Sequence, residues 1–465
     1  IQAKYGYEGQ SASIQPILTW PQDKPGTVNI VYDVREQPPA KVGEIKIIGN
    51  YVTRQNVILR QLQGISPGQV LSYPDLRVAE ANLTRLNIFE NNPEQGIHPT
   101  VEVIPNQEDK EFKDIAVHVQ ETATGSLMFG LGVNSDAGLV GSVVLNERNF
   151  DITNWPTSFD ELLSGRAFRG ADEEFRIEAV PGTDLQRYTV SFREPSLFDS
   201  PYSFGTSGYY YDQLFNEYTE ERIGGRFTIG RQLNKYWSVA ETMRIEEVGV
   251  HNVYDGEPAQ IADFAGEHFL LGLRTGVTFD ARDSFVRPTE GSLVELSYEQ
   301  CFGDYTFPIF NIEADKYWTT YQRPDGSGRQ VLALRSQLGF TTSDAPVYER
   351  FYAGGFRSMR GFEFRGVGPD VDGWKVGGDF MWLNSLEYQV PIKANDNIYL
   401  DFFVDSGTVD SKVSLDNYRV TAGFGVRVVV PMLGPVPIAL DFGFPIVKAP
   451  TDNTQVFSFW VGFFH

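Results

Sequence analysis

The sequence predicts an all-β transmembrane barrel of sixteen antiparallel strands, preceded by a small α+β domain. Three observations predict this fold. After Gly125 the helical period disappears, and the rest of the chain alternates apolar and polar residues in segments of nine to fifteen residues. Tilted membrane strands need about 9–11 residues, whereas strands of water-soluble sandwiches average about 5–6. Sixteen such segments can be counted, an even number, as single-chain bacterial barrels require.

The candidate strands are 125–133, 138–147, 172–181, 187–195, 202–213, 221–233, 236–249, 267–280, 290–302, 306–321, 329–341, 378–391, 397–405, 418–430, 435–443 and 455–465.

Composition excludes several classes of protein. The 39 Lys and Arg against 61 Asp and Glu give a net charge of -22, which repels phosphate backbones, so we expect no nucleic-acid partner. One cysteine, Cys301, forbids an intrachain disulfide, and with five histidines we expect no Cys/His metal site. The longest uncharged stretch near the C-terminus, 428–440, contains three prolines, so no helical membrane span is expected.

Residues 1–40 are expected to be the end of a domain whose earlier part is absent. The chain starts at Ile1 without a basic and apolar leader, which indicates a mature or trimmed product. Residues 27–36 alternate as a half-buried strand, and Pro38 and Pro39 end it. This strand has no obvious partner nearby in the sequence.

Residues 41–122 predict a compact βααββ domain. A short strand at 44–48 precedes a helix that Thr53 could cap and that stops at Gly64. A second helix follows Pro74, with apolar residues at intervals of three and four. Two alternating strands close the unit, at 100–104 and 115–120.

Residues 123–465 predict the barrel. In 269–280 and 418–430 one face is apolar, while arginine and glycine recur on the other. In a closed barrel in lipid, the apolar face points outward and the charged face lines a wet lumen. We expect the short breaks to be periplasmic turns and the long ones to be external loops. The short breaks are 181–186, 232–235 and 431–434, and the long ones are 251–266 and 342–377.

At this point the sequence resembles the BamA-type outer-membrane β-barrel assembly and translocation family, which includes the chloroplast outer-envelope import channel. Residues 41–122 resemble a polypeptide-transport-associated (POTRA) domain through EIKIIGN, LNIFE and IAVHVQE, and residues 1–40 resemble the remnant of a preceding one. In the barrel, DARDSFVRPTEG at 280–291 resembles the family's internal turn. SMRGFEFRGVGP at 358–369 resembles its arginine-glycine-aromatic loop motif.

The resemblance implies a site inside the lumen. The loop motif is Arg360, Gly361 and Phe362, and the family assigns Glu387 and Asp405 as the partners of Arg360. Strand parity places both carboxylates opposite in phase to apolar neighbours, and therefore in the lumen. A guanidinium can satisfy two carboxylates through its fixed donors, which would hold loop 342–377 inside the barrel as a strut.

The first and last strands must pair to close the barrel. Glycines recur in both strands and supply no side chains to the sheet. They are Gly130 and Gly132 in the first strand and Gly462, two residues after Trp460, in the last. The glycines either leave a weak seam that can template an incoming strand or relieve crowding in the lumen. The residues leave both interpretations open, and the resemblance favours the gate. The chain ends in His465 where the family usually ends in an aromatic residue.

The function implied by the resemblance is an outer-membrane β-barrel insertase of a Gram-negative-type bacterium, with POTRA domains in the periplasm. Its partners would be unfolded outer-membrane proteins, the lipid bilayer, periplasmic chaperones and accessory lipoproteins. The alternatives are a secretion or import pore of the same family and, less favoured, a passive porin. We expect no enzyme, cofactor or metal. The stretch from Asp370 to Gly373 lacks the ligands of a calcium loop and predicts a solvated turn.

Overall fold

The computed structural model describes residues 2–21, 26–163, 165, 167–254, 256–393, 397–429 and 437–461. The chain divides into two compact units. The first comprises residues 1–126 and 146–175, and the second residues 127–145 and 176–465. No helix in these described ranges is long and apolar enough to cross a membrane.

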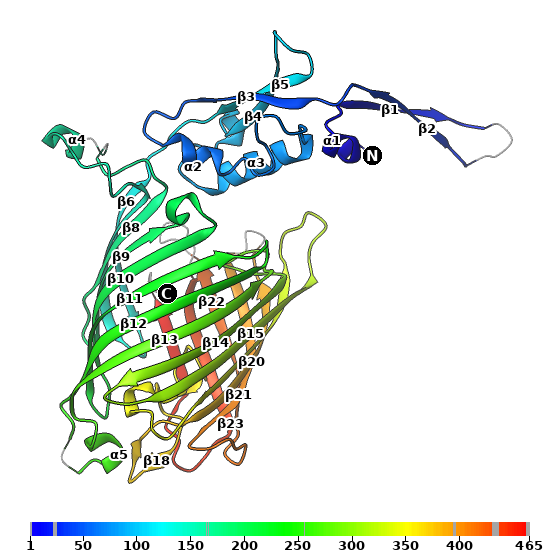
Figure 1. Ribbon diagram of the computed structural model, residues 1–465. Coiled ribbons are helices and arrows are strands. Elements are labelled where there is room, and N and C mark those ends of the chain that lie inside the picture. Colours follow the sequence, from blue (N-terminus) through cyan, green and yellow to red (C-terminus); the bar gives the residue numbers. More distant parts are fainter. Residues whose placement is uncertain are drawn as a thin grey trace. The chain divides into compact units, whose positions relative to one another are not determined.

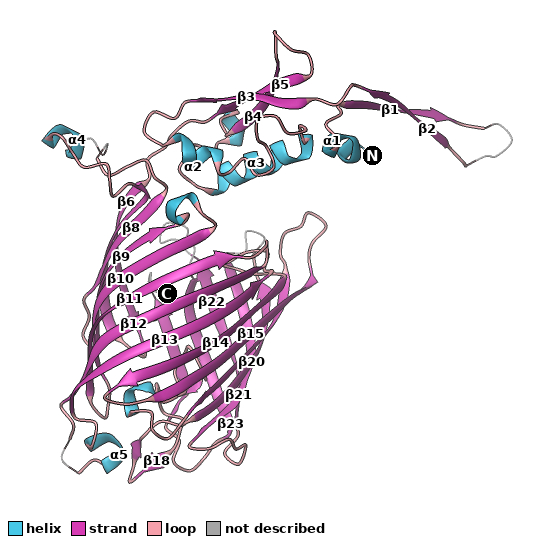
Figure 2. Ribbon diagram, viewed as in Figure 1, coloured by secondary structure: helices cyan, strands magenta, loops and turns pink. Residues whose placement is uncertain are grey.

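The first unit contains a three-stranded sheet covered by two helices. Its order is β3 (Lys41–Ile48), α2 (Gln55–Leu59), α3 (Tyr73–Arg85), η1 (Pro93–Gln95), β4 (Thr100–Pro105) and β5 (Phe112–His118). Strand β5 is central, parallel to β3 and antiparallel to β4. Figure 2 shows α2 and α3 on one face of this sheet. The apolar residues of the helices and strands form one buried core there, which explains the periodicity in the sequence.

Two details of this unit differ from expectation. Strand β2 (Asn29–Glu36) does have a partner, because it forms a hairpin with β1 (Ala12–Thr19), which follows α1 (Gln2–Tyr7). Strand β1 contains Pro16, and an internal proline weakens a strand signal in the sequence. Thr53 does not cap α2; its hydroxyl accepts a hydrogen bond from Asn149 Nδ2 at 3.0 Å, and the helix begins after Arg54.

The boundary between the units also differs from the one expected at residue 122. Residues 146–175, which include α4 (Phe159–Leu163), cluster with the first unit. Ion pairs explain this. Arg54 Nη2 lies 2.6 Å from Asp151 Oδ2, and Arg60 Nη2 lies 2.8 Å from Asp172 Oδ2. Both arginines flank α2, so charge and backbone contacts hold the connection after β7 against that helix.

The second unit is a closed barrel of sixteen strands, as predicted (Figure 1). The strands are β6 (Gly125–Asn134), β7 (Gly138–Phe150), β8 (Glu173–Val180), β9 (Leu185–Glu194), β10 (Tyr202–Leu214), β11 (Thr219–Gln232), β12 (Trp237–His251), β13 (Gly266–Asp280), β14 (Gly291–Gly303), β15 (Phe307–Tyr321), β16 (Gln330–Thr341), β20 (Phe380–Pro391), β21 (Ile398–Asp410), β22 (Arg419–Val429), β23 (Pro437–Val447) and β25 (Phe457–Val461). Each pairs with its neighbours in chain order, and β25 pairs with β6.

The connections between strands alternate between the two ends of the barrel because the strands are antiparallel. Residues 342–379, between β16 and β20, are called the plug loop below, and the end where they begin is called the plug end. The short break at 181–186 falls at the plug end, so its expected place among the turns of the opposite end is wrong. The expected break at 431–434 lies outside the described residues. Loop length alone therefore did not separate the two ends.

The two faces of the barrel wall follow strand parity. On β21, Phe402 and Val404 are 48% and 42% exposed on the outer face, whereas Phe403 and Asp405 are 3% and 1% exposed inside. Apolar side chains facing outward and charged side chains facing inward are typical of a barrel in lipid.

Candidate functional site

The plug loop folds back into the barrel. It contains η3 (Val347–Glu349), β17 (Gly361–Phe362), β18 (Asp370–Val371) and β19 (Trp374–Lys375). Strand β17 pairs with β24 (Thr454–Gln455), and β18 and β19 form a small hairpin. Figure 1 shows the loop in yellow at the end of the barrel that also carries α5 (Ala259–Ala262). Backbone pairing and an apolar cluster around Met359 and Phe362 therefore give the loop a defined structure.

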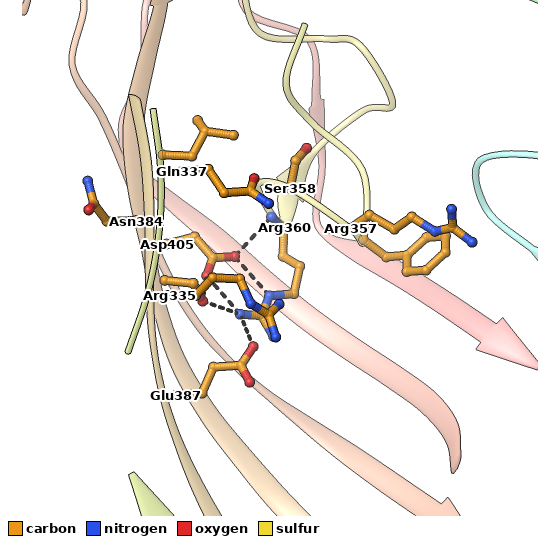
Figure 3. Close-up of a pocket in the computed structure, with 11 residues that line it drawn as sticks. Arg335, Gln337, Arg357, Ser358, Arg360, Asn384, Glu387 and Asp405 are labelled. Atoms are coloured by element: carbon orange, nitrogen blue, oxygen red, sulfur yellow. Dashed lines mark hydrogen bonds and ion pairs between the residues drawn. The ribbon is translucent and has the colours of Figure 1, made fainter. Parts of the chain in front are cut away.

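Arg360 is the centre of the first contact between the plug loop and the barrel wall. Its Nε and Nη2 donate to the two oxygens of Asp405 at 2.8 and 2.7 Å, which is a bidentate pair. Its Nη2 also lies 2.7 Å from Glu387 Oε1. Figure 3 shows Arg360 reaching from the loop to both carboxylates, while Arg357 points away from them. The structure thus brings together the three residues that the loop motif and strand parity single out.

The contact is larger than the sequence predicted. Arg360 Nη1 lies 3.4 Å from Asp401 Oδ2, and the ring centroid of Phe403 lies 3.6 Å from its guanidinium carbon. Arg427 Nη2 lies 3.1 Å from the same oxygen of Asp401. Parity alone could have placed Asp401 and Arg427 in the lumen, because they alternate with outward apolar residues. Their contact with the loop could not be inferred from the sequence.

Gly361 and Phe362 hold the backbone of the loop against the wall. Gly361 has a φ of +94°, and a Cβ atom there would lie 2.8 Å from Thr421 Cγ2 and 3.1 Å from the backbone of Gly443. Only glycine tolerates both the left-handed conformation and this approach. Phe362 is 1% exposed and packs in the apolar cluster. The motif therefore combines an ion pair, a close backbone approach and an apolar anchor.

A second contact fixes the plug loop to a different part of the wall, and the sequence did not reveal it. Glu349 Oε1 lies 2.7 Å from Arg222 Nη1 on β11 and 3.0 Å from Arg244 Nη1 on β12. Burial alone would raise the pKa of Glu349, but the charges of the two arginines and their hydrogen bonds outweigh it and lower the pKa to about 2. The carboxylate is therefore charged at neutral pH. The first contact lies on β20 and β21 and the second on β11 and β12, so the loop is anchored to two separate parts of the barrel wall.

Replacing Glu349 with glutamine should loosen the plug loop without unfolding the barrel. Arg222 and Arg244 keep Glu246, which lies 2.9 and 2.6 Å from them, so no arginine is left unpaired. The loss of one charged partner should therefore cost about 1–3 kcal/mol. The measurements are trypsin cleavage within the loop and solute flux through liposomes, and both should rise. Asp372→Asn, an exposed change of equal charge in the same loop, is the control; equal effects of the two variants would contradict the assignment.

The seam between β25 and β6 is short in the described residues. It consists of the pairs Trp460↔Asn134 and Val461↔Val133, with a hydrogen bond of 3.2 Å from the Ser135 N–H to the Phe459 carbonyl. Gly130 and Gly132 lie in β6, beyond these pairs. Gly462 and His465 lie outside the described residues.

A cavity of about 560 Å³ lies in the lumen beside the first contact. It is lined by Arg360 and Glu387, by Val286 of the turn between β13 and β14, and by Trp460 of the seam. Trp460 is 7% exposed and faces this cavity from the last strand. The loop anchor and the seam therefore border the same internal space.

The remaining sequence predictions concern sites of other kinds. The stretch from Asp370 to Gly373 forms the turn of the β18–β19 hairpin, and Lys375 Nζ lies 3.4 Å from Asp370 Oδ2. Cys301 is fully buried beside an apolar cluster, and its thiol accepts a hydrogen bond from Arg244 Nη2 at 3.7 Å and donates one to Glu299 Oε1 at 3.9 Å. Within the described part of the chain, no group of three His, Cys, Asp or Glu side chains is arranged to hold a metal ion.

Asp136, in the turn between β6 and β7, gives the site a pH dependence. Burial raises the pKa of its carboxyl to about 6, although Ser135 and the Phe356 N–H donate hydrogen bonds to it and Arg357 lies nearby. Because this pKa lies above that of an unfolded aspartate, the native state binds more protons between about pH 4 and 6, and stability falls as pH rises through that range.

Replacing Asp136 with asparagine should remove this loss of folding stability with rising pH. At about pH 7.5 the variant should be more stable than the parent by about 1–2 kcal/mol, and at about pH 4 the two should be alike. Unfolding of the detergent-solubilised protein in urea at the two pH values measures this. Asp416→Asn, an exposed change in another turn at the plug end, serves as the control. A pH slope that persists unchanged in Asp136→Asn would show that another group is responsible.

Comparisons with known proteins agree with this architecture. Residues 168–464 match the model of the Omp85 superfamily domain. The outer membrane protein assembly factor BamA of Nitratidesulfovibrio vulgaris is 26% identical over 433 residues, covering 90% of this chain and 50% of that protein. BamA of Neisseria meningitidis is 24% identical, covering 98% of this chain and 60% of that protein. The chain thus spans about half the length of the curated relatives it matches.

Solved structures share the fold. The crystal structure of BamA from Haemophilus ducreyi lacking POTRA domains 1–3 superposes with a TM-score of 0.73 at 20% identity, covering 99% of this chain and 91% of that one. CdiB from Acinetobacter baumannii gives a TM-score of 0.61 at 15% identity, covering 99% of this chain and 79% of that one. At these identities the likeness concerns the fold.

Proposed function

The chain belongs to the Omp85 superfamily, and from that premise we propose that it inserts β-barrel proteins into the outer membrane. The observation that carries the proposal is the closure of a sixteen-stranded barrel by the pairing of its last strand, β25, with its first strand, β6. When these two strands part, the edge of β6 can accept the backbone of an incoming strand by β-augmentation. The similarity to BamA proteins, whose names describe outer membrane protein assembly factors, supports the same function.

The first unit would receive unfolded clients in the periplasm. We assign residues 41–122 to a POTRA domain and residues 1–40 to the end of a preceding one, on the order of β3, α2, α3, β4 and β5. Both β3 and β4 are edge strands of their sheet. Val42 of β3 already exchanges backbone hydrogen bonds with Gly68 and Gln69, so β4 and the rest of β3 offer an edge to an extended client. Periplasmic chaperones and accessory lipoproteins would deliver clients to this unit or act beside it.

The energy for insertion would come from the client itself. Pairing of its backbone and burial of its apolar face in lipid are favourable, so the proposal needs no nucleotide, cofactor or catalytic residue. The protein would contribute a template edge at the seam and a closed lumen. The plug loop supports this role rather than that of a secretion or import pore. Contacts with two separate parts of the barrel wall hold the loop inside the lumen, where a pore would need an open path.

Reconstitution in liposomes tests the function. An unfolded barrel substrate should fold faster into liposomes that contain the protein than into empty ones. Folding is measured by the change in gel mobility of unheated samples, and flux of a small solute is recorded in parallel. Solute flux without faster folding would support a porin, and passage of a soluble client into the lumen of the liposomes would support a pore.

A further inference from the structure

A second cavity, of about 380 Å³, lies at the plug end of the barrel. Five connections between strands at this end and the plug loop contribute its lining. Four carboxylates line it, from Asp136, Asp184, Glu217 and Glu363. Each comes from a different segment, so the acidic character of the cavity depends on the closed barrel with the loop in place.

Positive charge does not balance these carboxylates. Arg365 is the single basic residue among the described residues that line the cavity. Its guanidinium carbon lies 3.5 Å from the ring centroid of Tyr352 and 4.0 Å from that of Phe215, and its Nη2 donates to the Tyr218 hydroxyl at 3.2 Å. The charge of Arg365 also acts on Glu217, and Arg357 lies near Asp136, so the four carboxylates still outnumber the basic groups around them.

Glu217 is the most buried of the four carboxylates that line the cavity. Its side chain is 5% exposed, and no described residue donates a hydrogen bond to its carboxylate or forms an ion pair within 4 Å of it. Buried carboxylates are almost always paired, because the loss of hydration is costly. The environment of Asp136 shows the same imbalance, since burial raises its pKa to about 6. Both groups would gain from a cation in the cavity.

We propose that this cavity binds a linear organic polycation, with the chemistry of a polyamine. Each ammonium group donates three hydrogen bonds, and several along one chain can meet carboxylates that come from separate segments. Phe364, whose ring stacks on that of Phe215 with centroids 6.1 Å apart, also lines the cavity and adds cation–π attraction for an alkylammonium group. A metal ion fits less well, because metals need converging oxygen ligands and no described group of three acidic side chains converges here.

The proposal goes beyond membrane insertion and does not depend on it. Spermidine is titrated into the full chain in detergent by calorimetry, in parallel with Mg²⁺ at equal ionic strength. Saturable spermidine binding is expected, and Glu217→Gln should weaken it about tenfold, because one buried charge-assisted contact is lost. Asp416→Asn, an exposed change of equal charge at the same end of the barrel, should leave the affinity within about twofold.

The gel mobility of unheated samples shows whether each variant is folded. Should Glu217→Gln fail to fold, Glu363→Gln takes its place as a second lining carboxylate on the loop. Equal weakening by the cavity variant and by Asp416→Asn would reduce the binding to general surface charge and overturn the proposal. Mg²⁺ that binds more tightly than spermidine, or no saturable binding at all, would overturn it as well.

Discussion

Replacing Arg360 with alanine should reduce the rate at which the protein inserts an unfolded barrel substrate by about tenfold or more. The substitution removes the bidentate partner of Asp405 and the cation paired with Glu387, while Asp401 keeps Arg427. Breaking a buried ion pair by deleting one partner typically costs about 3–5 kcal/mol. That cost falls on the contact between the plug loop and β20 and β21, so the loop should leave its position in the lumen.

Three measurements report this change: the folding rate of the substrate, trypsin cleavage within the plug loop, and the gel mobility of the unheated variant. Arg360→Lys should retain part of the activity, because lysine keeps the charge but loses the bidentate geometry. Arg357→Ala is the matched control, since Arg357 is an exposed arginine of the same loop that points away from the carboxylates. The assigned role fails if Arg360→Ala leaves both the loop and the insertion rate as they are in the parent protein.

A disulfide across the seam should stop insertion almost completely. Asn134 and Trp460 face each other across β6 and β25. Pairs in an antiparallel ladder alternate between hydrogen-bonded and non-hydrogen-bonded. Because the neighbouring pair of Ser135 and Phe459 is hydrogen-bonded, Asn134 and Trp460 form a non-hydrogen-bonded pair, with Cα atoms about 4.5 Å apart and within disulfide range. Cysteines at both positions, in a Cys301→Ser background, should lock the edge of β6 and prevent a client strand from pairing with it.

The controls separate locking from damage. The side chain of Asn134 accepts hydrogen bonds from the Asp136 and Ala137 N–H groups, so its loss could perturb the turn. Activity should therefore return when the disulfide is reduced. A disulfide between cysteines at Val239 and Val277, which pair across β12 and β13, should leave the insertion rate unchanged. Full activity with the seam oxidised would exclude the gate and leave relief of crowding as the role of the seam glycines.

The two kinds of experiment test different parts of the site. The Arg360 series tests whether the plug loop must stay in the lumen, and the disulfide tests whether β6 must part from β25. The two features border one cavity, through Arg360 on one side and Trp460 on the other. A client strand that enters at the seam would therefore displace contacts around the same cavity that the Arg360 contact borders. Loss of either feature should reduce insertion.

The sequence by itself determined the barrel and its faces. Alternation at period two is a property of each strand alone, so it gave the sixteen segments and placed Glu387 and Asp405 in the lumen. The loop motif identified Arg360 through a resemblance, because its glycines and arginines are local features of the chain.

The tertiary structure decided the contacts between distant segments. It paired β1 with β2 across a proline, placed Glu349 between Arg222 and Arg244, and added Asp401 and Arg427 to the Arg360 contact. Glu349 is more than one hundred residues from either arginine. Such contacts depend on how the barrel closes and on the path of the plug loop through it, and a periodicity that repeats every two residues contains no information about either.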